Sequence, residues 1–569
     1  MRLLALLALL AAPALADDRG GQREFRDIFF SYLERDARIH DPNARKLLYA
    51  LPQELHSPPR EAFAGPPLQA LDALYKKWRP TQLYELGVKA PFHRIENPEA
   101  AFQRSGPVTI VIVPGIFGEF IAHFPFEEIL KNKGSAFARQ FQAAWARARP
   151  ADKTDAVFSM ADVKHVERPL PQIIEVASID DSHGRPLVKL VFLKPLFASL
   201  ETLGKLSENT EVYLRRLGKF WNVVGAQRFY LLGYSRGAAV ALDLAVAARA
   251  RAPWGKKLAG VISHAGVVYG TPLADASLTP GDPSAQLLAV VTELAAKLNS
   301  VPADFPEKPG MRDELRLLRL IEQNWVAWAK AGYRIARIQL HAAKPDPGVA
   351  LEQIRVSAPG VRSTAHFIKE FAWEHYKLLR RPRITGLEKS EHFKNVQRFK
   401  TMVAKMTDGV GALTTRARLD WWRTHTLPAG ISLYAIGGTM ADAARPERAN
   451  RPLFDGRGVS LLAKDPMTTF VDSLDFQSLR GSYYQMVAAA GGEVNDSQVP
   501  LQRIRFWTRL NKRLNPRGPD LPAYYLGTLG QDHWGLAFPV AVEQHNHKAN
   551  PFPRVALMKA IATFIARHP

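Results

Sequence analysis

The sequence predicts an α/β fold, in which helices cover both faces of a mostly parallel sheet and a large helical insertion interrupts the core. Short apolar runs rich in β-branched residues, such as VTIVIV at 108–113, are typical of strands buried on both faces. Helical patterns alternate with these runs, which is the chain order that a parallel sheet produces. Between residues 273 and 425 the alternation stops and helical patterns dominate, so we expect an insertion there.

The strands and helices of the core follow from these runs in chain order. We expect strands at VTIVIVPG (108–115), IIEVASID (173–180), PLVKLVFLK (186–194), RFYLLGYS (228–235), within AGVISHAGVVYGTP (259–272), ISLYAIGG (431–438) and AYYLGTLG (523–530). We expect helices at FEEILKNKGSAFARQFQAAWARA (126–148), near 202–219, at RGAAVALDLAVAARA (236–250) and at RVALMKAIATFIARH (554–568). In the insertion, apolar residues of 311–330 recur at spacings of three and four, which predicts one apolar helix face.

The N-terminus predicts an exported protein. An arginine, the apolar run LLALLALLAA and the A-x-A end at 14–16 are typical of a secretory signal peptide. We expect cleavage before Asp17 and a mature protein in the periplasm or outside the cell. The expected segments are a signal peptide at 1–16, an N-terminal helical flank at 17–105, the first part of the core at 106–272, a helical cap or lid at 273–425 and the second part of the core at 426–569.

Composition narrows the function classes. The 569 residues include no cysteine, which excludes disulfides, a cysteine nucleophile and a cysteine zinc site. With 76 Lys and Arg against 54 Asp and Glu, the net charge is +22, which favours contact with an anionic membrane or envelope polymer. We expect no nucleic-acid partner, because the chain is exported and shows no nucleic-acid-binding motif. The oligomeric state is left open.

A candidate nucleophile lies between a predicted strand and a predicted helix. Gly233-Tyr234-Ser235-Arg236-Gly237 is a G-x-S-x-G pentapeptide, preceded by a buried strand and followed by an apolar helix. A turn this tight needs small residues on both sides of the serine. It exposes the serine oxygen at the carboxyl edge of the sheet, above a helix N-terminus that favours negative charge. Ser235 is therefore the predicted nucleophile.

A serine nucleophile needs a base and an orienting acid. His533 follows the last predicted strand and is the expected base, whereas His264 lies within a strand and is expected to be packed or hydrogen-bonded. The acid should lie between the serine and the histidine in the chain. Asp496, in the polar turn NDSQVP, is the first candidate, and Asp442, just after ISLYAIGG, is the second.

An oxyanion hole needs two main-chain N–H groups, one from the residue after the nucleophile and one from the loop after the first core strand. Arg236 supplies the first. The second is expected from Pro114-Gly115-Ile116-Phe117-Gly118, with Ile116 as the donor. This loop does not have the spacing of a phosphate loop, which would end in Gly-Lys followed by Ser or Thr.

These motifs resemble the α/β-hydrolase superfamily, in its lipase and acyltransferase branch. VPGIFGEF is similar to the Val-Pro-Gly-x-x-Gly segment of lecithin–cholesterol acyltransferase-type enzymes, and GYSRG matches the nucleophile turn. YGTPLAD (269–275) and NDSQVP resemble stretches of bacterial lipases. The resemblance covers about 106–275 and 430–569, and it implies an α/β-hydrolase core with the acid role on Asp496 and an oxyanion N–H on Ile116.

The predicted activity is hydrolysis of carboxylic, lipid-like esters through an acyl-enzyme, with Ser235, His533 and Asp496 as the triad. The expected partners are an ester or lipid substrate and an anionic surface, and neither a metal nor an organic cofactor is expected. Alternatives are an acyltransferase with the same triad, a peptidase, or a non-enzymatic binding protein on this fold. Several aromatic side chains of the insertion either pack it onto the core or line an acyl channel.

Overall fold

The described part of the chain covers the core and little of the predicted insertion. The computed structural model describes residues 21–35, 48–49, 93–116, 134–147, 173–195, 201–224, 227–279, 405, 408–438, 495–529, 533, 535–537 and 553–569. The predicted signal peptide, the helix expected at 311–330 and Asp442 lie outside these residues. Within them, no helix combines the length and apolar character that crossing a bilayer requires.

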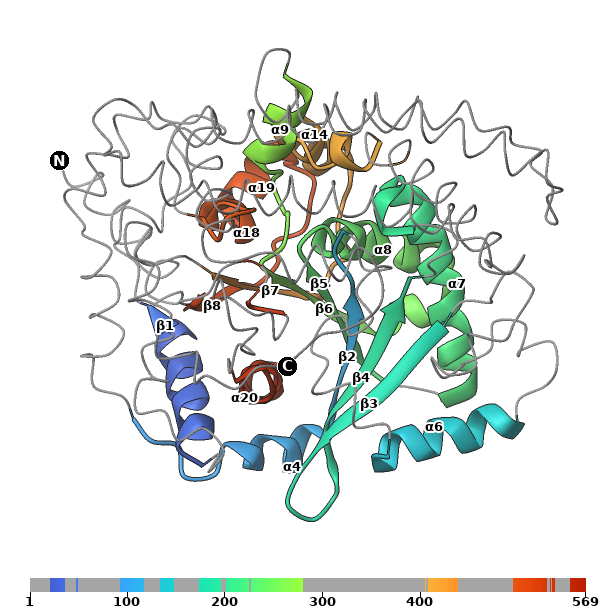
Figure 1. The fold of residues 1–569 in the computed structure, drawn as a ribbon, viewed down its shortest axis with the longest axis vertical. Coiled ribbons are helices and arrows are strands. Elements are labelled where there is room, and N and C mark those ends of the chain that lie inside the picture. Colours follow the sequence, from blue (N-terminus) through green and yellow to red (C-terminus); the bar gives the residue numbers. More distant parts are fainter. Residues whose placement is uncertain are drawn as a thin grey trace, which may run out of the picture.

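The described residues form an α/β fold around one mostly parallel sheet (Figure 1). The strands are β1 (Leu48–Tyr49), β2 (Val108–Val113), β3 (Ile173–Asp180), β4 (Pro186–Lys194), β5 (Phe229–Tyr234), β6 (Leu258–His264), β7 (Ser432–Gly438) and β8 (Ala523–Leu529), in the spatial order β1-β8-β7-β6-β5-β2-β4-β3. All neighbours pair in parallel except β1 with β8 and β3 with β4, at the two edges. The predicted α/β architecture is therefore confirmed.

The central strands are apolar on both sides because both faces of the sheet are covered. In β2, Ile110 and Ile112 join one hydrophobic cluster, whereas Val111 and Val113 join the other. Alternate residues of a strand point to opposite faces, so each cluster is one side of the sheet. A continuous apolar run is the pattern of such a doubly buried strand.

Two sets of helices cover these faces (Figure 1). The first face packs against the helix over residues 21–35, α4 (Ala101–Ser105) and α20 (Arg554–Arg567). The second face packs against α6 (Ala136–Arg147), α7 (Leu206–Val224), α8 (Gly237–Arg251), α14 (Thr415–Thr424), α18 (Leu501–Ile504) and α19 (Thr508–Leu514). The predicted helix at 126–148 thus appears as α6, which begins at Ala136, and residues 126–133 lie outside the described part of the chain.

The N-terminal flank packs directly onto the core. Tyr32 forms a 2.7 Å hydrogen bond with Thr563 of α20, and Arg567 pairs with Glu24 at 2.6 Å. In addition, β1 adds a two-residue antiparallel strand beside β8, where only helices were expected. Two residues are too few to show a periodicity, so this strand could not be predicted from the sequence.

The two ends of the predicted insertion are helical and lie together. Its first residues belong to α9 (Pro272–Leu278) and its last to α14. The Asp275 carboxylate accepts a 2.8 Å hydrogen bond from the main-chain N–H of Thr415. This contact joins residues 140 positions apart and closes the base of the insertion. Most of the predicted cap lies outside the described residues.

Candidate active site

The turn from β5 to α8 holds Ser235 in a strained conformation. Its φ is 54°, a left-handed value that is uncommon for any residue except glycine. A Cβ atom at Gly233 would lie 2.3 Å from the Cα of Ala238, and one at Gly237 would lie 2.2 Å from the main-chain oxygen of Val113. Both distances are far below van der Waals contact, so the two glycines of the motif are required for the turn.

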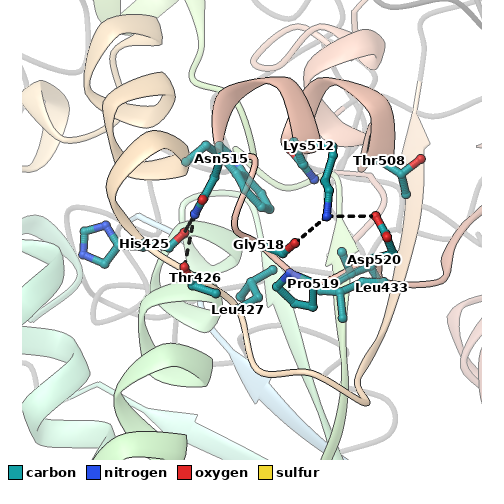
Figure 2. A pocket seen from close by; sticks show the side chains of 13 residues that line it. His425, Thr426, Leu427, Leu433, Thr508, Lys512, Asn515, Gly518, Pro519 and Asp520 are labelled. Carbon is teal, nitrogen blue, oxygen red and sulfur yellow. Dashed lines mark hydrogen bonds and ion pairs between the residues drawn. The ribbon is translucent and has the colours of Figure 1, made fainter.

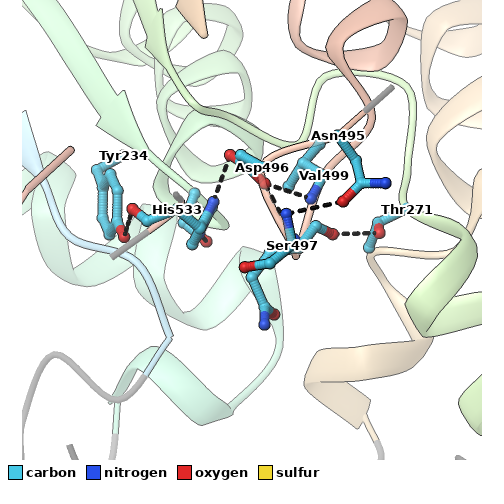
Figure 3. Close-up of polar contacts among 9 residues, drawn as sticks. Tyr234, Thr271, Asn495, Asp496, Ser497, Val499 and His533 are labelled. Atoms are coloured by element: carbon cyan, nitrogen blue, oxygen red, sulfur yellow. Dashed lines mark hydrogen bonds and ion pairs between the residues drawn. The ribbon is translucent and has the colours of Figure 1, made fainter. Parts of the chain in front are cut away.

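Ser235, His533 and Asp496 form a continuous hydrogen-bonded chain. The Ser235 Oγ lies 2.8 Å from His533 Nε2. His533 Nδ1 lies 2.8 Å from Asp496 Oδ2 (Figure 3). A carboxylate can only accept, so the Nδ1 atom carries the proton and donates it to Asp496. The Nε2 atom is then free of a proton and accepts the hydroxyl hydrogen of Ser235. This arrangement is the one required of a serine nucleophile with a histidine base.

The acid is held by its own turn. Asp496 is fully buried, and its Oδ1 atom accepts hydrogen bonds from the main-chain N–H groups of Gln498 and Val499 at 3.0 and 2.8 Å (Figure 3). These bonds leave the Oδ2 atom directed at the histidine. The Thr271 hydroxyl, from the loop before α9, donates a 2.7 Å bond to the main-chain oxygen of Gln498. The turn therefore fixes the carboxylate, and Thr271 fixes the turn.

The segment around His533 is tied to three other parts of the core. Its main-chain N–H donates a 2.7 Å bond to the main-chain oxygen of Asp496. The Tyr234 hydroxyl donates a 2.7 Å bond to the main-chain oxygen of His533 (Figure 3). Arg554, at the start of α20, donates a 2.8 Å bond to the oxygen of Gly535. Sequence reasoning did not find Tyr234 or Arg554, because both contacts join positions with no local pattern between them.

The two segments that carry the predicted oxyanion donors lie beside the nucleophile. The loop after β2 lies against the serine, since a Cβ atom at Gly115 would be 2.9 Å from the Cβ of Ser235. Ile116 follows this glycine directly. Arg236 occupies the N-cap position of α8, where the first N–H groups of a helix point towards its N-terminal end. The structure thus brings the loop that contains Ile116 to the turn that contains Arg236, and the role of the two N–H groups in holding an oxyanion stays a prediction.

His264 ends β6 beside the site and is fully buried. Its ring centroid lies 6.0 Å from that of Tyr234. Burial lowers the pKa of His264 to about 3, because a charged imidazolium is disfavoured away from water. It is therefore neutral at ordinary pH, and its complete burial agrees with the expectation that it is packed or hydrogen-bonded.

A separate cavity lies at the opposite end of the sheet. It has a volume of about 260 Å³ and lies between α14, α19, the amino end of β7 and the segment before β8 (Figure 2). Lys512 is among the residues that line it, and its ammonium lies 3.5 Å from a carboxylate oxygen of Asp520. None of the triad residues lines it. Among the described residues, no three His, Asp or Glu side chains are grouped to hold a metal ion.

Comparison with known proteins gives this chain no family. No family model matches it, and no curated protein matches it in sequence. The second acid candidate, Asp442, lies outside the described residues, so its distance from His533 is not defined.

Proposed function

We propose that this chain is a serine hydrolase with an α/β-hydrolase fold, and that it cleaves carboxylic esters through an acyl-enzyme. The observation that carries the proposal is the unbroken chain of hydrogen bonds from Ser235 through His533 to Asp496, with both links at 2.8 Å. Two further features support it. The serine lies in a strained turn above the N-terminus of α8, and a glycine-rich loop meets it from β2.

In the proposed reaction, the Ser235 oxygen attacks the ester carbonyl while His533 Nε2 takes the hydroxyl proton. The carbonyl oxygen becomes an oxyanion, which the main-chain N–H groups of Ile116 and Arg236 stabilise. Asp496 stabilises the imidazolium that forms. The imidazolium then returns the proton to the departing alcohol as the C–O bond breaks, which leaves the acyl group on Ser235. A water molecule, activated by His533, releases the acid and restores the serine.

The substrate class follows from the expectations about export and charge. An exported, basic protein meets anionic lipid and envelope surfaces, so lipid-like esters are the proposed substrates. If an apolar channel receives the acyl chain, each buried methylene contributes about 0.8 kcal/mol, or about fourfold in kcat/KM. Specificity should then rise steeply across two- to twelve-carbon p-nitrophenyl esters, and added salt should weaken activity on anionic vesicles. A flat chain-length profile would contradict the lipid-like assignment.

The experiment that tests the proposed chemistry is labelling with a fluorophosphonate, combined with ester turnover. Ser235→Ala should abolish labelling and lower kcat by roughly 10⁶. Ser263→Ala is the matched control, because Ser263 is a buried serine at the carboxyl end of the adjacent β6 strand and donates to the oxygen of Ile504. The Ser263→Ala variant should still react with the fluorophosphonate and should still cleave the ester. Persistent labelling of Ser235→Ala would refute the nucleophile assignment.

Product analysis separates hydrolysis from acyl transfer. Both reactions share the acyl-enzyme and differ only in whether water or an alcohol accepts the acyl group. In the presence of an alcohol acceptor, a hydrolase should release mainly the free acid. A dominant ester product would assign the chain to the acyltransferases instead.

A further inference from the structure

Two buried side chains hold the main chain around His533 from outside the triad. Tyr234, at the end of β5, and Arg554, at the start of α20, are 2% and 0% exposed. Each donates to a main-chain oxygen of the segment that carries the base, Tyr234 to His533 at 2.7 Å and Arg554 to Gly535 at 2.8 Å. The two donors come from different elements and reach carbonyls two residues apart.

The Tyr234 contact closes a ring with the two reacting side chains. Tyr234 is bonded covalently to Ser235, and its hydroxyl is bonded to the main chain of His533, whose ring returns to the Ser235 oxygen. A tyrosine side chain is rigid apart from two torsions. The Tyr234 side chain therefore fixes the distance between the main chain at Ser235 and the main chain at His533.

The acid alone does not provide this restraint. Asp496 contacts His533 through both its carboxylate and its main-chain oxygen, but both contacts hold the histidine from the side of the acid turn. The restraint from the side of β5 comes through Tyr234. The Tyr234 ring is itself confined, with ring centroids at 5.1 Å from His533 and 6.0 Å from His264.

We propose that Tyr234 and Arg554 are positioning residues, which clamp the main chain of the His533 segment and so hold the base in line with Ser235. The kinetic part of this inference rests on the proposed hydrolase function. Neither residue touches the reacting atoms. Misplacing a catalytic group by about 1 Å can cost about a hundredfold in rate, so loss of one clamp contact should lower kcat and leave KM nearly unchanged.

The first test removes one hydroxyl at a time. Tyr234→Phe should lower kcat at least about tenfold, with KM within about twofold of wild type. Tyr434→Phe is the matched control, because Tyr434 is a fully buried tyrosine of β7 whose hydroxyl donates a 3.0 Å bond to the main-chain oxygen of His568. Each of the two variants loses one hydrogen bond from a tyrosine hydroxyl to a main-chain oxygen, so we expect similar decreases in their melting temperatures. Only Tyr234→Phe should lose kcat.

The second test addresses the arginine. Arg554→Lys keeps the charge but loses the planar fork that reaches the Gly535 oxygen. Arg216→Lys is its control, because Arg216 is fully buried and donates a 2.9 Å bond to the main-chain oxygen of Lys194, on β4. We expect a lower kcat for Arg554→Lys and an unchanged kcat for Arg216→Lys.

Hydrogen exchange gives a readout that does not depend on activity. Amides of peptides that contain residues 533–537 should exchange faster in Tyr234→Phe and Arg554→Lys than in the two controls. Unchanged exchange in these peptides, or equal losses of kcat in the test and control variants, would overturn the proposal that Tyr234 and Arg554 position the His533 segment. A wild-type protein that neither reacts with a fluorophosphonate nor cleaves any ester would instead overturn the proposed function, and the exchange result would still decide the clamp.

Discussion

Replacing Asp496 by asparagine tests the role of the acid with little change of shape. The Oδ1 atom of the carboxylate accepts two main-chain N–H groups, from Gln498 and Val499, and the oxygen of an asparagine can accept the same two. The amide nitrogen then takes the place of Oδ2, 2.8 Å from His533 Nδ1. Because that nitrogen donates, Nδ1 must become the acceptor, and the ring proton moves to Nε2.

The expected loss follows from this change of tautomer. With a proton on Nε2, His533 no longer accepts the Ser235 hydrogen, so the base is lost rather than weakened. The equivalent change in other triads costs about 10⁴ in kcat, which corresponds to about 5 kcal/mol of transition-state stabilisation. KM should change little, since the buried carboxylate is not expected to touch the substrate.

The assay is p-nitrophenyl ester hydrolysis under saturating conditions, with thermal unfolding of each variant to confirm that it folds. Asp442→Asn is the comparison, because Asp442 was the second acid candidate, and it should keep kcat within about threefold of wild type. A folded Asp496→Asn variant that keeps more than about a tenth of wild-type kcat would refute the tautomer argument. A larger loss in Asp442→Asn would move the acid role to the segment after β7.

Three other predictions concern the framework of the site. Thr271→Val removes the hydroxyl that donates to the oxygen of Gln498 and should lower kcat severalfold at unchanged KM; an unchanged kcat would show that the acid turn holds itself. Gly237→Ala should lower the free energy of unfolding by about 1–3 kcal/mol, whereas Gly411→Ala, where a Cβ atom meets nothing within 4 Å, should be neutral in urea unfolding. Because burial lowers the pKa of His264 to about 3, the unfolded state takes up a proton as pH falls below about 6.5 and the folded state does not, so wild-type stability should fall from pH 6.5 towards 3. His264→Gln should reduce the dependence of the free energy of unfolding on pH between 6.5 and 3. An unchanged dependence in this variant would contradict the assignment of His264 as neutral in the folded protein.

The core strands could be predicted from the sequence because their burial is complete. Each residue of β2, β5 and β6 is buried, so the local composition alone carries the signal of a doubly covered sheet. The G-x-S-x-G turn was also predictable, because Gly233 is required by a contact of 2.3 Å with Ala238 of the same turn. The 2.2 Å contact that requires Gly237 is with Val113 of β2, and only the tertiary structure shows it. His533 was recognisable by its place after the last strand.

Strand order and edge pairing needed the tertiary structure. The strands β3 and β4 were expected, but their position at the far edge, with β4 beside β2, depends on pairing between distant segments. The same is true of β1, whose two residues join β8 across the chain. The local pattern of apolar residues indicates which face of a strand is buried, but it does not indicate which other strand pairs with it.

The site divides in the same way. The sequence by itself determined the residue types of a serine, a histidine and two candidate acids, because these depend on motif and chain order. Only the tertiary structure brought Asp496 within 2.8 Å of His533, and only it placed the Tyr234 hydroxyl on a carbonyl 299 residues away. Contacts of this kind are set by how the sheet packs its loops together, and a buried tyrosine or arginine gives the same local pattern whether it fills the core or holds a catalytic base.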